Sequence, residues 1–283
     1  TLAVGAGARL NHNAYTGSAV VSVASGATLA LQSWGYGETT LSLGGLSASA
    51  IAVVVNSGTI RISGTTATSY GRGVTVQAGG ATLEAATGAN WTIDTVNDNV
   101  AWGYTGNPSL TFTGAGTGTF QKVFSGSGAL IKSGTGSWTF SGDNTYTGAT
   151  TVNGGTMVLS KSAGAQLYKT GGFFGANDTT YITGNTGGTL ETYNWDYGAT
   201  GALSELRNNY YSVAINGGTI RLNDTFTAVS GFQVGANGGT LEVTAGNTYT
   251  KGAGDVASQN VIRFSADSTL TVTGAGNTVI NDN

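Results

Sequence analysis

Side chains that could perform acid–base or nucleophilic chemistry are few in this sequence of 283 residues. The single histidine, His12, lies in the polar stretch Asn11-His12-Asn13, and there is no cysteine. A catalytic triad or a zinc-type metal site needs several such groups close together. The sequence therefore predicts no catalytic residues, no metal site and no cofactor.

The 14 acidic residues are spread along the chain. The nearest approach to a carboxylate pair is Asp94 with Asp98, followed by Trp102 and Tyr104. Two carboxylates beside aromatic rings could flank a glycosidic bond, and they could also bind Ca²⁺ weakly. A turn rich in Asp and Asn explains the same residues without any ligand. A polysaccharide-active enzyme therefore stays open only as a third alternative.

Exposed aromatic rings are the second candidate for binding, because a ring can stack on a sugar or contact a protein. Two of the pairs stand in equivalent loops, and the third follows the acidic turn. The predicted binding residues are Trp34, Tyr36, Trp195, Tyr197, Trp102 and Tyr104. The alternative is that these rings close the loops against the protein core.

A short phrase recurs along the chain and indicates what positions these residues. It consists of a glycine or another small turn residue, then Thr, an apolar residue, any residue and usually a second apolar one, as in Gly58-Thr59-Ile60-Arg61-Ile62. The phrase returns at steps of about 20 to 33 residues. Hairpin strands recur every 8 to 12 residues, so the longer step favours the coils of a β-solenoid.

A second, longer period lies above this step. Thr59 and Thr219 open matching phrases, and Trp34 matches Trp195 at almost the same offset. The unit therefore returns after roughly 160 residues, which we call the long period. We expect one continuous solenoid over residues 1–283, in which residues 1–124 match about 156–283 and residues 125–155 form a single-copy block. This phase suggests that both ends join further repeats or other chains.

Composition excludes several classes of partner. Only 9% of the residues are charged and the net charge is −3, with no basic patch, so nucleic acid is not expected. No apolar run approaches the ~20 residues of a membrane span. The absence of cysteine is compatible with export.

The single-copy block carries a family resemblance. It runs Gly126-Ser-Gly-Ala-Leu130-Ile-Lys132-Ser-Gly-Thr-Gly136, then Ser-Trp138-Thr-Phe140, Asn144-Thr-Tyr146-Thr-Gly148 and Gly154-Gly-Thr156. This resembles the autotransporter-associated β-strand repeat, with Trp138, Phe140 and Met157 where leucine is commoner. The resemblance implies an all-β, right-handed parallel β-helix. We expect about a dozen coils, with loop excursions around residues 161–215.

The resemblance also implies an exported, extracellular segment on the surface of a Gram-negative bacterium. We expect structural or adhesive work as a rigid stalk or fibre, not catalysis. The alternative is an adhesin that binds glycans or host proteins through the aromatic loops. Expected partners are copies of the same chain stacked end to end, neighbouring repeats, and surface glycans.

Overall fold

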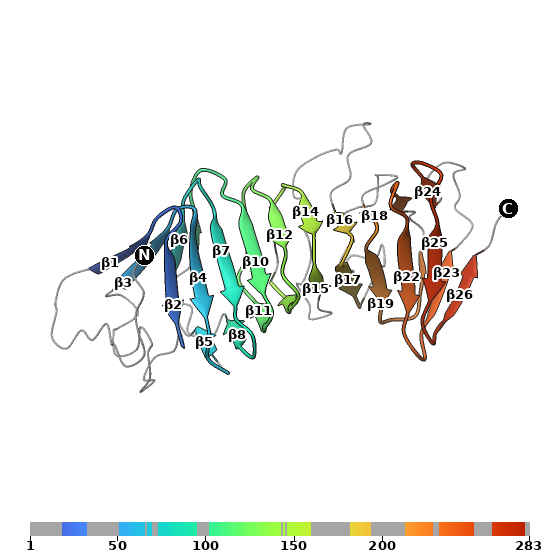
Figure 1. The fold of residues 1–283 in the computed structure, drawn as a ribbon, viewed down its shortest axis with the longest axis horizontal. Helices are drawn as coiled ribbons and strands as arrows, with labels where there is room; N and C mark the ends of the chain where they lie inside the picture. The colour runs from blue at the N-terminus through green and yellow to red at the C-terminus, as the bar shows by residue number, and fades with distance from the viewer. Residues whose placement is uncertain are drawn as a thin grey trace.

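The computed structural model describes residues 19–32, 51–65, 67–69, 73–94, 102–142, 144, 146–159, 182–193, 213–228, 232–251 and 262–280. In these ranges every regular element is a strand, and the strands stack one behind another along an elongated body (Figure 1). Every pair of named strands is parallel. The predicted all-β, right-handed parallel β-helix is confirmed.

The longest sheet has ten strands and runs the length of the body, so ten coils pass through the described residues. In order it contains β2 (Thr28–Leu31), β4 (Gly58–Ile62), β7 (Ala81–Ala85), β10 (Leu110–Gly114), β12 (Leu130–Lys132), β14 (Thr150–Val152), β16 (Ile182–Asn185), β18 (Val213–Asn216), β21 (Gln233–Val234) and β24 (Arg263–Phe264). The register places like residues above like: Thr28, Thr59 and Thr82 are successive partners. The recurring phrase is therefore a column of this sheet.

A nine-stranded sheet forms the second long face. Its strands are β5 (Ala67–Ser69), β8 (Asn90–Ile93), β11 (Thr117–Phe120), β13 (Ser137–Phe140), β15 (Gly155–Leu159), β17 (Gly188–Thr192), β19 (Thr219–Leu222), β22 (Gly239–Val243) and β25 (Leu270–Thr273). Each strand follows one of the ten-stranded sheet in the chain, so each coil turns from the first face onto the second.

Two short sheets occupy the remaining face. One contains β1 (Ala19–Val23), β3 (Ile51–Val55), β6 (Val74–Val76) and β9 (Gly103–Tyr104), and the other contains β20 (Phe226–Ala228), β23 (Thr248–Lys251) and β26 (Asn277–Ile280). In chain order, β6, β9, β20 and β23 each lie between a strand of the nine-stranded sheet and the next strand of the ten-stranded sheet. The coils that contain these strands therefore have three faces.

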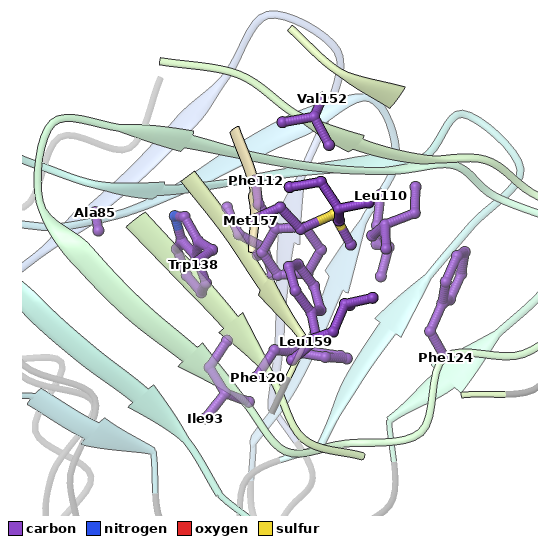
Figure 2. Close-up of a cluster of buried hydrophobic side chains, with 14 of the residues drawn as sticks. Ala85, Ile93, Leu110, Phe112, Phe120, Phe124, Trp138, Val152, Met157 and Leu159 are labelled. Atoms are coloured by element: carbon purple, nitrogen blue, oxygen red, sulfur yellow. The ribbon is translucent and has the colours of Figure 1, made fainter. Parts of the chain in front are cut away.

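Alternation along the strands builds the core. In β7 (Ala81–Ala85) the apolar residues point inward and are buried, while Thr82 and Glu84 point outward. Figure 2 shows Phe112, Phe120, Trp138 and Met157 gathered in one interior from both long sheets. Period-two alternation of this kind is what a strand with one face in the core requires.

Sharp corners between faces depend on glycine. Gly114 has φ +100°, and a Cβ atom at this position would lie 1.9 Å from the carbonyl oxygen of Ala85 in the coil beneath. No other residue has both the backbone freedom and the absence of a side chain that this corner needs.

Segments one long period apart lie on neighbouring faces. Thr59 belongs to the ten-stranded sheet and its match Thr219 to the nine-stranded sheet. Likewise β9 lies in a short sheet, β10 in the ten-stranded sheet and β11 in the nine-stranded sheet. Their sequence matches β24, β25 and β26 lie in the ten-stranded sheet, the nine-stranded sheet and a short sheet, in that order. Matching segments are thus turned by one face about the axis. The division into 1–124, 125–155 and 156–283 stays a prediction.

Candidate functional site

Lys132 of the single-copy block is buried inside a corner of the solenoid. Its Nζ donates hydrogen bonds to the carbonyl oxygens of Ser133 at 2.6 Å, Gly134 at 3.2 Å and Gly154 at 2.9 Å. Removal from water lowers the pKa of the amine to about 8. Because Gly154 lies one coil further along, the ammonium ties two successive corner turns together.

Aromatic rings fill the core beside this corner. Trp138 packs edge-on against Phe112 at 4.8 Å and Trp91 at 5.7 Å between ring centroids, and its Nε1 donates to the carbonyl oxygen of Thr113 at 3.1 Å. Gly118, between Trp91 and Trp138 in the stack, provides the room: a Cβ atom there would lie 2.4 to 2.6 Å from carbons of the Trp138 ring. The block is therefore a packing centre.

Asn144 and Tyr146 close the block from inside. The Asn144 side chain accepts a hydrogen bond from the Phe124 amide at 2.8 Å and donates to the Gly142 carbonyl at 3.0 Å. The Tyr146 hydroxyl pairs with that of Thr150, and burial raises its pKa. The polar groups of these two family-motif residues are therefore engaged in holding the core together.

The predicted binding aromatics fall into two groups. Trp102 is buried edge-on against Phe120, with ring centroids 5.5 Å apart, and Tyr104 packs on Phe124 at 5.1 Å. Both rings thus close their loop against the core, as the alternative interpretation expects. Trp34, Tyr36, Trp195 and Tyr197 lie outside the described residues. Glycan stacking on those four residues stays a prediction.

The candidate acidic and metal groups gather nowhere in the described ranges. Asp94 is buried, whereas Asp98 and His12 lie outside those ranges. Within the described ranges no three His, Cys, Asp or Glu side chains come together, and no helix is long and apolar enough to cross a bilayer. The expected absence of catalytic and metal sites therefore stays a prediction.

Sequence reasoning missed a charged ladder on the outer face of the nine-stranded sheet. Arg221 bridges Glu191 of the coil before it, at 3.2 Å, and Glu242 of the coil after it, at 2.9 Å. The Asn223 amide also donates to Glu191 at 2.8 Å. Arg221 lies 30 residues from Glu191 and 21 residues from Glu242 in the sequence. The register of the stacked coils, not the sequence spacing, therefore reveals the ladder. Arg61 and Glu84, the sequence matches of Arg221 and Glu242, form the equivalent ion pair on the ten-stranded sheet at 3.4 Å.

A polar cleft of about 450 Å³ lies over the corner turns between β18 and β25. Its lining includes Gly217, Gly238 and Gly239 together with the polar side chains of Asn237 and Asp267. Pockets of 300 to 1,000 Å³ are typical for small ligands. The cleft is large enough for a small polar molecule.

The last described coil exposes apolar side chains that its predecessors bury. Val272 is 44% exposed, although its partner one coil back, Leu241, is 1% exposed. Phe264 is 46% exposed, and its partner Val234 is fully buried. The apolar columns of the core thus extend into the last described coil, formed by β24, β25 and β26.

Comparison with known proteins agrees with this geometry. Residues 130–159 match the model of the passenger-associated transport repeat. A stretch of 100 residues, 34% of this chain, is 37% identical to the "Adhesin BmaC autotransporter" of Brucella suis biovar 1 (strain 1330), of which it covers 3%. No solved structure gives a significant match. The predicted family resemblance is confirmed for residues 130–159, and the expected extracellular, cell-surface location in a Gram-negative bacterium is confirmed.

Proposed function

We propose that the chain is a rigid spacer in a surface-exposed passenger, with a structural and adhesive role. The observation that carries the proposal is the uninterrupted parallel ladder of ten strands from β2 to β24. At about 4.8 Å per coil this ladder spans about 45 Å. A ladder with this many main-chain hydrogen bonds resists bending, which is what a stalk needs.

Small-angle X-ray scattering of the purified chain tests the rod. We expect an elongated particle with one cross-section along its length. Two copies of the chain fused in tandem should be longer at the same cross-section. A compact particle, or a tandem that folds back on itself, would refute the spacer.

The second candidate is a glycan-binding adhesin, and the polar cleft favours it. Asn237, Asp267 and Thr240 offer amide, carboxylate and hydroxyl groups, which can hydrogen-bond sugar hydroxyls. A glycan array should then detect binding that Asp267→Ala removes. The variant pair Trp34→Ala and Trp195→Ala tests the aromatic loops in the same array, and binding unchanged by all three changes, or none at all, rejects this function.

A further inference from the structure

We propose that the solenoid contains a yielding joint at the coil formed by β16 and β17, which we call the joint coil. The stack opens on the side of this coil that faces β14 and β15, while the coils on both sides stay folded. Such a joint rests on the proposed spacer function, because yielding at one place has a consequence only in a rod.

On the ten-stranded sheet, the joint coil lacks the core side chain that its neighbours provide. Gly184 lies between Val152 and Ile215, its partners in the coils before and after, and both partners are fully buried. Gly184 is itself buried, and among the described residues a Cβ atom there would meet only the carbonyl oxygen of Ala214, at 3.9 Å. Glycine inside a strand also loses more backbone entropy on folding than other residues do. The core column is therefore interrupted at this coil.

The nine-stranded sheet loses its apolar core side chain in the same coil. Thr192 lies between Leu159 and Leu222 in the inward column and is completely buried. Within the described part of the chain its hydroxyl has no hydrogen-bond partner. A buried hydroxyl without a partner costs free energy, whereas a buried leucine gains it. Because stacked coils are stabilised mainly by contacts with their nearest neighbours, two interruptions in one coil weaken the stack at that point.

Polar contacts on the outer surface fasten the joint coil to the coil after it. Glu191 of β17 accepts hydrogen bonds from Arg221 at 3.2 Å and from the Asn223 side chain at 2.8 Å. Arg221 lies in β19 and Asn223 follows it directly. These contacts compensate for the weak interior, so the joint coil stays with the coils that follow it.

The opposite side of the joint coil has a weaker outer contact. The partner of Glu191 in β15 is Val158, which carries no charge. Across this side the Asn185 side chain donates to that of Asn153 at 2.8 Å, in a position exposed to water. The match to the passenger-associated transport repeat, residues 130–159, ends at β15. The weak contact therefore lies between this repeat and the coils after it.

Hydrogen exchange of the purified chain, read by mass spectrometry of its peptides, locates the joint. Peptides from residues 182–192 should exchange about tenfold or more faster than peptides from residues 130–140 and 219–243, because the coil opens without unfolding of the whole stack. Uniform exchange along the ladder would overturn the proposal.

The Asn223 backbone amide reports which side opens. It donates to the Thr192 carbonyl at 3.0 Å, across the side that Glu191 fastens. We expect this amide to be as well protected as that of Thr244, which donates to the Leu222 carbonyl one coil later. Rapid exchange of the Asn223 amide would overturn the assignment of the opening to the side of β15.

Two substitutions test the cause. Thr192→Val replaces the unpaired hydroxyl by a methyl group of the same shape, and Gly184→Ala restores a core side chain. Together they should slow exchange of residues 182–192 about tenfold. The matched control is Thr189→Val, the same change on the outer face of the same strand, which should leave this exchange unchanged.

Equal effects of Thr192→Val and Thr189→Val, or no slowing in the doubly substituted chain, would refute the joint. Scattering judges the spacer separately. A compact particle rejects the proposed function, whereas uniform exchange in an elongated particle rejects the joint alone.

Discussion

Gly118→Ala should destabilise the middle of the solenoid, although alanine is usually more favourable than glycine within a strand. The added Cβ would meet three carbons of the Trp138 ring at 2.4 to 2.6 Å. That ring cannot withdraw easily, because Phe112 and Trp91 pack on it and its Nε1 is hydrogen-bonded. Overpacking of a dense core costs about 1–3 kcal/mol.

Part of this cost is offset. Alanine restricts the unfolded chain more than glycine does, which stabilises a strand by about 0.5–1 kcal/mol. The expected net loss is therefore about 1–2 kcal/mol. Gly184→Ala is the matched control, because a Cβ at Gly184 in β16 meets only one atom, a carbonyl oxygen at 3.9 Å. That variant should be neutral or up to about 1 kcal/mol more stable.

The assay must resolve regions, because stacked coils can unfold separately. Native-state hydrogen exchange of the Thr117 amide, which donates to Ala89 at 2.8 Å, reports the affected coil, and urea unfolding reports the whole chain. In a Trp138→Leu background the penalty of Gly118→Ala should largely vanish. Equal stabilities of the Gly118→Ala and Gly184→Ala variants, or an unchanged penalty without the tryptophan, would refute the steric reasoning.

Three further predictions concern polar groups. Burial lowers the pKa of Lys132 from 10.5 to about 8, so the folded chain binds this proton more weakly than the unfolded chain. Its contribution to stability is therefore largest above pH 10.5 and falls as the pH drops through 8. Urea unfolding should show the wild type gaining about 2–3 kcal/mol relative to Lys132→Met between pH 7.5 and 10, and a constant difference would contradict this. Arg221→Met breaks two partly exposed ion pairs and should cost about 1 kcal/mol in low salt and almost nothing in about 1 M NaCl, measured by the same unfolding assay. Asn144→Ala leaves the buried Phe124 amide without its acceptor and should cost about 1–3 kcal/mol in the same assay, with faster hydrogen exchange of that amide, and unchanged stability would contradict this.

The fold was predictable because strand alternation and glycine corners are local signals. Leu83 and Glu84 differ in burial as period two requires, and the step of the Thr phrase matches the coil. The aromatic side chains of Trp138 and Phe140 also point inward as the alternating pattern indicates.

The contacts between coils were not predictable, because they depend on the lengths of the loops between strands. The ion pairs of Arg221 join strands 30 and 21 residues away, and no fixed spacing in the sequence announces them. Trp102 could not be assigned to core or surface, since its orientation follows from the Phe120 ring on another strand. The burial of Lys132 was missed because three main-chain carbonyls, which carry no side-chain signature, surround it.

Segments one long period apart lie on neighbouring faces of the solenoid, and this rotation determines which way equivalent surfaces point along a longer protein of the same design. Because the complete coils at both ends of the described solenoid have three faces, a feature that recurs with this period would point in three successive directions before returning to the first. Successive copies of an outward patch, such as the ladder of Glu191, Arg221 and Glu242, would then face different directions around the axis of the solenoid. A cell that carried such solenoids could engage a target from whichever side it approached, and several weak contacts made together would hold far better than any one alone.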